Sequence, residues 1–346
     1  MSRQALAIMG SGMISGVGLN APASCAAIRC GIDNIQETRF MNSGGEWIMG
    51  SSVLLEKPWR GTKKLSKMLA SALRECIAGN FRFGLEEIPV LICLAENDRP
   101  GRLADLEDSV FLEIQAELGV HFHEKSRLLS HGRVGVGMAL QQARKLIYGE
   151  GIRKVIIAGA DSLLVGPTLT AYEEQERLLT SQNSNGFIPG EAAAAVMVGP
   201  VIATEEPQLL CLGVGSGVEK ATEESELPLR AEGLVQAIRA ALAEAGCSLG
   251  AMDFRITDVS GGQYSFKEAS LALTRILRER KEEFDIWHPA DCIGEVGAAI
   301  GIVILTVCLA TIRKAYAPGK NILCHLGNED GKRVAIILAY KSMRAT

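Results

Sequence analysis

Residues 128–138, LLSHGRVGVGM, place a short apolar strand directly before a turn and a glycine-spaced helix start. Such strand-turn-helix junctions often carry a catalytic nucleophile, because the tight turn exposes one side chain at the positive end of a helix. Here the turn reads His131-Gly132-Arg133 and supplies no cysteine. His131 is the titrating base at this junction and suggests base or nucleophilic chemistry with Ser130. A structural or surface role for the histidine is the alternative.

Arg133 would put a cation at the start of a helix, where the helix dipole prefers an anion. An arginine in this place could hold an anionic ligand or the carboxylate of a partner. The alternative is an exposed side chain or an ordinary salt bridge.

Two other groups of residues could do chemistry. His121 and His123 lie two apart and would share one face of a strand, as metal ligands do, but no third ligand is in view. Cys292 follows Asp291, and an adjacent acid raises the pKa of a thiol, so Cys292 is interpreted as a core or loop cysteine. No CxxC pair occurs. We therefore predict no metal site and no redox site.

Nucleotide binding is not predicted either. The glycines of GSGMISGVG, residues 10–18, lack the G-x-G-x-x-G spacing of a dinucleotide loop. We expect the protein to need no cofactor.

Short aliphatic and β-branched runs alternate with amphipathic stretches along the chain, which predicts an α/β fold with a largely buried sheet. The expected strands are 5–8, 90–94, 154–158, 193–198, 209–212, 256–259, 322–326 and 334–339. The expected helices are 64–79, 103–118, 136–149, 231–246, 265–280 and 297–315. The pattern looks duplicated, with a join near PVIATEEPQ at 200–208. We predict two pseudo-symmetric halves, 1–203 and 204–346, in an α/β/α/β/α arrangement.

Composition narrows the class of protein further. The formal net charge of −4 over 346 residues argues against a nucleic-acid binder, because phosphate contacts need a basic surface. The nine cysteines are an odd number and sit mostly in apolar patterns, as in a reduced, cytoplasmic protein. The N-terminal apolar run is broken by glycines, unlike a secretory signal. The apolar run 297–312 is shorter than the ~20 residues of a membrane span, so it predicts a buried central helix.

Six segments, in order along the chain, resemble the β-ketoacyl synthase branch of the thiolase superfamily. The most specific is SNGFIPGEAAAAVMV at 184–198, which is close to the family's DGFVxGEGAGVLVL. Within it, Phe187 and Glu191 are interpreted as packing and loop-anchoring residues. The other segments are 7–35, 154–163, 230–269, 293–312 and 321–340. The resemblance implies a thiolase-like fold and a dimer formed through the first half.

The resemblance also implies where a catalytic cysteine would stand. That position falls on Gly132 if Gly135 anchors the match, and on Arg133 if Leu140 and Ala143 do. Neither residue supplies the thiol on which condensing enzymes depend.

The two catalytic histidines of the family are also replaced. Ser260 takes the place of the first, and Gly294 or Glu295 the place of the second. The loop that helps to form the family's oxyanion hole reads His-Leu-Gly-Asn-Glu-Asp and contains Asn328. We expect a vestigial pocket with the candidate residues His131, Arg133, Phe187, Ser260, Cys292, Glu295 and Asn328.

These substitutions favour a protein without condensing activity. The resemblance suggests a non-catalytic partner or scaffold subunit, similar to a chain-length factor beside an active ketosynthase in fatty-acid or polyketide-type synthesis. An accessory or adaptor protein of a type VI secretion effector cluster is one alternative, and an atypical acyl-thioester decarboxylase or acyltransferase is another. Decarboxylating members keep both histidines, which counts against the enzyme. Expected partners are a second copy or a ketosynthase-like subunit, and an acyl carrier protein or a secretion effector, with no nucleic acid and no membrane span.

Overall fold

The computed structural model describes residues 4–78 and 84–343. Five strands form the core of the first half: β1 (Leu6–Ser15), β4 (Val90–Leu94), β5 (Arg127–Ser130), β6 (Val155–Ser162) and β7 (Glu191–Pro200). They lie side by side in the order β1-β7-β6-β4-β5, so β5 forms the edge of the sheet. The strand that precedes the elbow at residues 131–133 is therefore the outermost strand of this half.

The second half repeats this order. Its strands are β8 (Thr204–Val218), β9 (Phe254–Thr257), β10 (Ile286–Trp287), β11 (Asn321–Gly327) and β12 (Lys332–Met343), in the order β8-β12-β11-β9-β10. The two sets meet where Leu6 of β1 pairs with Cys211 of β8. We propose 1–203 and 204–346 as the two halves, because β8 begins at Thr204 and starts the repeat.

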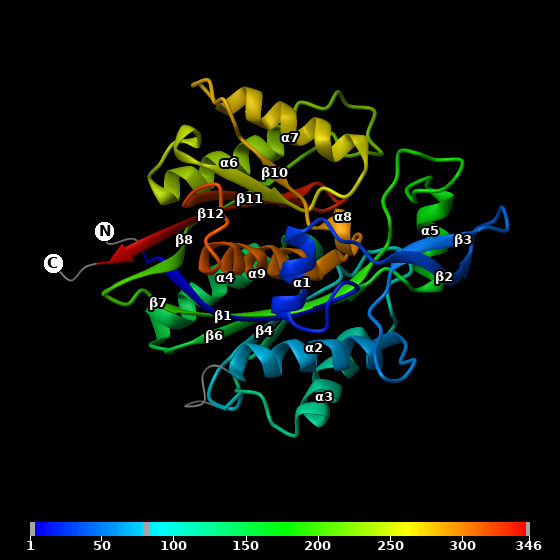
Figure 1. Ribbon diagram of the computed structural model, residues 1–346, viewed down its shortest axis with the longest axis horizontal. Helices are drawn as coiled ribbons and strands as arrows, with labels where there is room; N and C mark the ends of the chain where they lie inside the picture. The colour runs from blue at the N-terminus through cyan, green and yellow to red at the C-terminus, as the bar shows by residue number, and fades with distance from the viewer. Residues whose placement is uncertain (1–3, 79–83, 344–346) are drawn as a thin grey trace.

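Helices form three layers around these strands (Figure 1). Helices α2 (Gly61–Ala78) and α3 (Leu106–Leu118) cover one outer face, and α6 (Glu232–Ala245) and α7 (Gln263–Ile276) cover the other. Between the two sets of strands lie α1 (Ala21–Arg29), α4 (Gly135–Arg144) and α9 (Ile300–Arg313). This confirms the predicted five-layered α/β/α/β/α arrangement.

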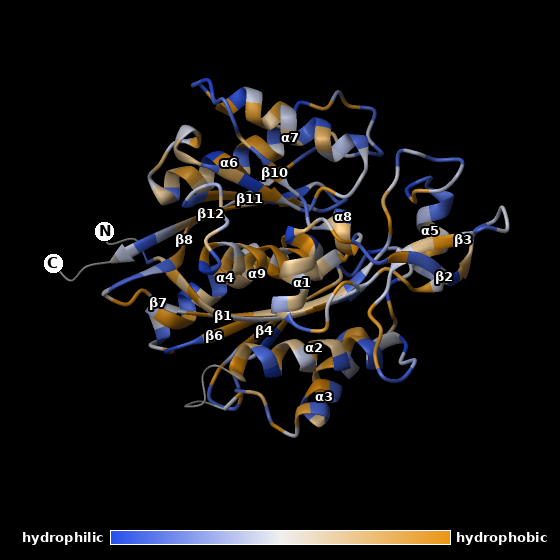
Figure 2. Ribbon diagram, viewed as in Figure 1, coloured by the Kyte–Doolittle hydropathy of each residue, from blue (hydrophilic) through white to orange (hydrophobic). Residues whose placement is uncertain are grey.

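Helix α9 contains most of the apolar run 297–312, which the sequence showed to be too short for a membrane span. Twelve of its fourteen residues are buried, and Figure 2 shows it as a hydrophobic helix in the middle layer. A helix that is hydrophobic on all sides must be enclosed by protein, and α9 is enclosed by the strands of both halves. Among the described residues no helix is both long enough and apolar enough to cross a membrane.

The eight predicted strands and six predicted helices all correspond to observed elements, with shifted ends. The helix predicted over 265–280 ends at Ile276, because Leu277 is extended. The helix predicted from 103 begins at Leu106, after Asp105 in a left-handed conformation. Residue 79, the predicted end of the first helix, lies outside the described residues.

Several elements had no counterpart among the expected strands and helices. They include helix α1, strand β10, the hairpin of β2 (Ile35–Met41) and β3 (Trp47–Ser51), helix α5 (Gly166–Glu174) and the short helix α8 (Ala290–Ile293). The hairpin and α5 lie together at one end of the molecule (Figure 1). His121 and His123 lie in a segment, residues 120–123, that has no regular structure, so they do not share the face of a strand. The hairpin lines one of the two pockets described below, and α5 brings Tyr172 to the polar network at the elbow.

Candidate functional site

The elbow after β5 turns through Gly132, whose φ is +57°. A Cβ atom built on this glycine would lie 2.2 Å from Oε2 of Glu96, which rules out any larger residue without rearrangement. The left-handed backbone also disfavours a side chain here. Gly132 therefore gives the turn its shape, and the next residue, Arg133, presents the side chain.

Asn328 holds the elbow against the loop that follows β11. Its amide donates to the carbonyl of His131 at 2.9 Å, and its Oδ1 accepts from the backbone N–H of Val134 at 3.2 Å. The side chain is 4% exposed. Asn328, a residue of the second half, thus satisfies two backbone groups of the elbow in the first half.

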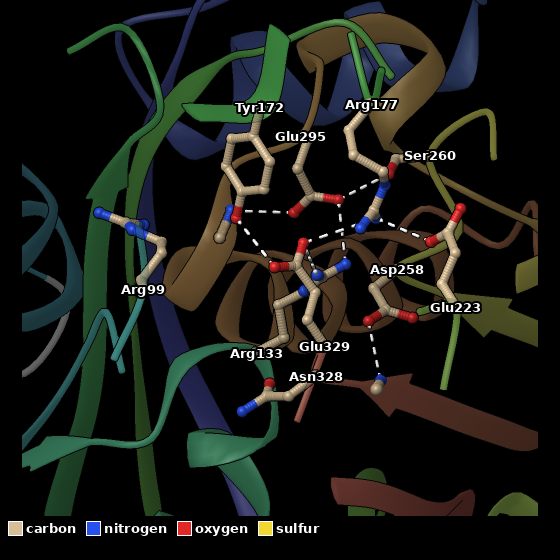
Figure 3. A network of polar contacts seen from close by, with 12 residues as sticks. Arg99, Arg133, Tyr172, Arg177, Glu223, Asp258, Ser260, Glu295, Asn328 and Glu329 are labelled. Atoms are coloured by element: carbon tan, nitrogen blue, oxygen red, sulfur yellow. Dashed lines mark hydrogen bonds and ion pairs between the residues drawn. The ribbon is translucent and has the colours of Figure 1, made fainter. Parts of the chain in front are cut away.

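Arg133, Ser260 and Glu295 meet at the elbow (Figure 3). The Arg133 guanidinium lies 3.4 Å from Oε2 of Glu295, and Ser260 donates its hydroxyl to the same oxygen at 2.6 Å. The other oxygen, Oε1, accepts from the backbone N–H of Gly297 at 3.0 Å. Of the alternative positions at 294 and 295, Glu295 is the one with a side chain in this network.

Glu329 extends the network toward α5. Its carboxylate lies 3.4 Å from the guanidinium of Arg133 and 3.5 Å from that of Arg177, and it accepts from the Tyr172 hydroxyl at 3.2 Å. Arg177 also pairs with Glu223 at 3.0 Å. Charges thus alternate in sign from Glu295 outward to Glu223, which keeps each one partnered.

Burial sets the protonation of these groups. It would lower the pKa of Arg133 by itself, but the charges of Glu295 and Glu329 outweigh it and raise that pKa, so the guanidinium stays charged. Burial also raises the pKa of Tyr172, so the phenol stays protonated and can donate to Glu329. Asp258 lies nearby, and burial raises its pKa to about 6 although Arg133 opposes the shift.

A cavity of about 300 Å³, which we call the elbow pocket, is bordered by Glu96, Arg133, Asp258, Asn328 and Glu329 among others. Eight carboxylates and four guanidiniums stand among the described residues that line it. Arg333, one of these guanidiniums, is bound by Glu268 at 2.8 Å. The pocket is therefore polar and carries more negative than positive charge.

Three other candidate residues do not join the network. Phe187 is buried and packs edge-on against Tyr172, with ring centres 5.1 Å apart, so it supports that phenol. Cys292 is buried in α8, where burial and Asp291 raise its pKa to about 11. The pKa of His131 is lowered by burial and by Lys332, which favours a neutral imidazole. Neither His131 nor Cys292 lines the elbow pocket.

Glu191 lies away from the elbow, as a buried anchor. It accepts from the backbone N–H of Val53 at 2.8 Å and from the hydroxyls of Ser162 at 2.8 Å and Ser52 at 3.0 Å. Nor do the histidines near β5 form a metal site. His123 accepts from the backbone N–H of Lys125, and in the described part of the chain no group of three potential ligands could hold a metal ion.

Several residues of the network had no signal in the sequence. Glu96 and Tyr172 come from separate segments, the loop after β4 and helix α5, that no motif connects to the elbow. Asp258 and Glu329 lie within two residues of the candidates Ser260 and Asn328, so the same loops pointed to them. The position of these two acids beside Ser260 and Asn328 is the signal in the sequence that could have identified them.

Comparisons with known proteins rest on structure. No known family profile matches the sequence, and no curated protein matches it. The chain is similar to the ishigamide ketosynthase/chain length factor, with a TM-score of 0.78 and 16% identity over 98% of this chain and 100% of that chain. It is similar to a ketosynthase, ApeO, in complex with its chain length factor, ApeC, from Xenorhabdus doucetiae, with a TM-score of 0.74 and 15% identity over 98% of both chains.

The chain has the ketosynthase fold. A β-ketoacyl synthase from Burkholderia phymatum is also similar, with a TM-score of 0.73 and 14% identity over 98% of this chain and 100% of that chain. The likeness thus runs over whole chains, as the resemblance in sequence predicted. At this level of identity the likeness establishes the ketosynthase fold and nothing about the reaction. The function must be argued from the residues at the elbow.

Proposed function

We propose that this protein is a catalytically inactive β-ketoacyl synthase-like chain that acts as a non-catalytic partner or scaffold subunit. Its proposed partner is an active ketosynthase in fatty-acid or polyketide-type synthesis. The observation that carries the proposal is the elbow, where Gly132 has no side chain and Arg133 is tied to Glu295 and Glu329. Condensation needs a thiolate there, and neither a glycine nor an ion-paired guanidinium can act as a nucleophile.

The cysteine beside the elbow does not replace the missing thiol. Cys93 is the cysteine beside the elbow, with its Sγ 3.4 Å from a Cβ built on Gly135. It is fully buried in β4, and burial raises its pKa to about 12. A thiol in that state supplies almost no thiolate near neutral pH.

The charges beside the elbow also argue against an acyl substrate. Arg99 and Asp161 form a buried ion pair with side chains 4% and 1% exposed, and Glu96 lies against Gly132. An apolar chain lying against these groups would remove their remaining hydration without offering hydrogen bonds. The proposal is therefore a scaffold subunit rather than a second acyl-binding subunit.

The partner's contact is proposed to lie at the open edge of β5. Among the described residues this strand pairs with β4 alone, so its other edge offers unpaired backbone groups. Helices α3 and α4, which flank β5 in the chain, expose Leu112 and Met138. Strand pairing supported by such side chains would suit a second thiolase-like subunit, and the similar solved structures include ketosynthases with chain length factors.

Affinity capture from the native host tests the proposal. We expect a ketosynthase-like chain in stoichiometric amount with the wild-type protein and with Leu227→Glu, and a loss of it with Met138→Glu. Leu227 is the matched control, because it is exposed outside the first half. Capture of a secretion effector instead would support the adaptor alternative, and capture of the same chain alone would contradict a heteromeric partner.

A turnover assay separates the scaffold from the enzyme alternative. The folded protein should neither decarboxylate malonyl thioesters nor transfer acyl groups. Arg133→Cys should gain no condensing activity, because Ser260 and Glu295 cannot replace two imidazoles. Wild-type turnover that Ser260→Ala abolishes would reject the proposal.

A further inference from the structure

A second cavity of about 260 Å³ lies beneath the β2–β3 hairpin, and we call it the hairpin pocket. Its walls come from β2, the loop 52–60, the first turn of α2, Leu103 and the segment 162–165. Figure 1 shows the hairpin beside the start of α2, at the end of the molecule where α5 lies. The hairpin pocket shares no lining residue with the elbow pocket.

The polar groups on one side of the hairpin pocket already have partners. Lys64 forms an ion pair with Glu191, and Glu191 also accepts from Ser52 and Ser162, as described above. Glu191 is 2% exposed. This buried pair is neutral as a whole, so it gives no net charge to the pocket.

Two arginines on the remaining wall have no such partner. Arg39 and Arg60 line the hairpin pocket and are exposed, and in the described part of the chain neither makes an ion pair. Glu37 is the remaining carboxylate among the described lining residues. A guanidinium presents paired N–H donors that match a carboxylate or a phosphate. These two arginines therefore give the wall an excess of positive charge and of free donors.

The surroundings increase this positive potential. Trp59 lines the pocket, and the ammonium groups of Lys57 and Lys63 lie 5.9 and 4.9 Å from its ring centre. Lys67 lies 4.7 Å from the same ring centre, but its charge is already paired with Glu117. Gly61, also a lining residue, begins α2, whose positive end adds to the field. An anion that approaches the pocket thus meets cations from several directions.

The other walls are apolar. They are formed by Phe40, Leu54, Trp59, Leu103, Leu164 and Val165. Leu54 is 68% exposed, so a ligand that covered it would remove apolar surface from water. The volume is below the ~300–1,000 Å³ of sites for drug-sized ligands, which indicates a small molecule.

We propose that the hairpin pocket is a binding site for a small organic anion with an apolar body, whose anionic group is held by Arg39 and Arg60 and whose body lies against Trp59 and Leu54. This site is independent of the elbow, so it stands whether or not the protein is a scaffold subunit. Its chemistry is that of a short-chain or medium-chain carboxylate.

Octanoate is the probe, with octan-1-ol and octylamine as matched molecules of the same chain length. Binding is measured by calorimetry and by the tryptophan fluorescence of the wild-type protein. We expect octanoate to bind with one site per chain and the two other molecules to bind at least tenfold more weakly, because neither offers an anionic group to the two guanidiniums.

Variants locate the site. Arg39→Gln/Arg60→Gln should weaken octanoate binding at least tenfold, and Trp59→Leu should remove most of the fluorescence response. Arg280→Gln, an exposed arginine outside both pockets, is the control and should bind as the wild type does. Circular dichroism confirms that each variant is folded. No binding of octanoate, equal binding of octan-1-ol, or an unchanged affinity in the double arginine variant would overturn the proposal.

Discussion

Arg133 is a cation in the interior, and at the scale of single residues its two carboxylate partners decide the stability of the elbow. Glu295 is 3% exposed and Arg133 has a side chain 15% exposed, so neither charge is well hydrated. A buried pair contributes little compared with apolar residues, but removal of one partner leaves an uncompensated charge. The side chains at the elbow are thus mutually dependent.

Replacement of Arg133 by leucine should therefore lower the free energy of unfolding by about 3–5 kcal/mol. The reason is that Glu295 would keep the Ser260 hydroxyl and the Gly297 N–H as partners and lose its cation. Arg133→Leu/Glu295→Gln should recover a large part of the loss, and exposed Arg280→Leu should change little. Urea unfolding measures all three variants. If Arg133→Leu were as stable as the wild type, the ion pair between Arg133 and Glu295 would not be formed.

Asp258 gives the elbow a pH dependence with a definite sign. Its pKa in the folded protein is about 6 and its ordinary value is 3.8, so the folded state holds the proton more tightly than the unfolded state. The contribution of this group to stability therefore falls as the pH rises from about 4 to about 6, and stays low above that range.

Asp258→Asn removes this titration and tests it. The stability of the variant relative to the wild type should rise by about 2–3 kcal/mol between pH 4 and pH 7, since each pKa unit corresponds to ~1.4 kcal/mol. Urea unfolding of the variant and the wild type across this range measures the difference. A flat difference for Asp258→Asn would contradict the raised pKa of Asp258.

At the scale of elements, the turn between β5 and α4 depends on one backbone position. Gly132→Ala should cost more than Gly151→Ala, although both glycines are left-handed, with φ of +57° and +73°. Gly151 has open space around it, so it reports the conformational cost alone, ~1–2 kcal/mol. At Gly132 the new methyl group also meets Glu96.

Glu96→Ala in the Gly132→Ala background should return much of the excess cost. Thermal unfolding of the four proteins gives the comparison. Equal losses of stability at the two glycines would mean that the elbow accommodates a side chain at no extra cost in free energy. The role assigned to Gly132 would then be wrong.

The elements that could be predicted from the sequence are those with a strong apolar pattern. Strands such as β4 and the buried helix α9 have continuous apolar runs, so both appeared in the prediction. The β2–β3 hairpin did not, because Glu37 and Arg39 interrupt its apolar residues and its pairing is irregular between Glu37 and Met41. Residues near known motifs, such as Ser260 and Glu295, were predicted to share a pocket. Tyr172 and Arg177 were not, because only tertiary packing brings α5 to the elbow.

At the scale of the whole molecule, the two halves repeat one strand order but share one interior. Helix α9 belongs to the second half and packs against β1, β6 and β7 of the first. The strands β1 and β8 also pair directly across the join. The apolar surface of α9 would be exposed to water if the halves separated, which is unfavourable in proportion to its area.

The two halves should therefore unfold as one unit even when the chain between them is cut. A protease site inserted at 201–203, a segment without regular structure between β7 and β8, allows the cut to be made in the folded protein. The nicked protein should elute as one species in size-exclusion chromatography and unfold in a single transition. The fragments 1–203 and 204–346 expressed separately should be insoluble, because each exposes the surface that α9 and its neighbouring strands bury, and co-expression should restore a soluble pair. Two separate transitions, or a soluble and folded fragment, would show that each half has a core of its own.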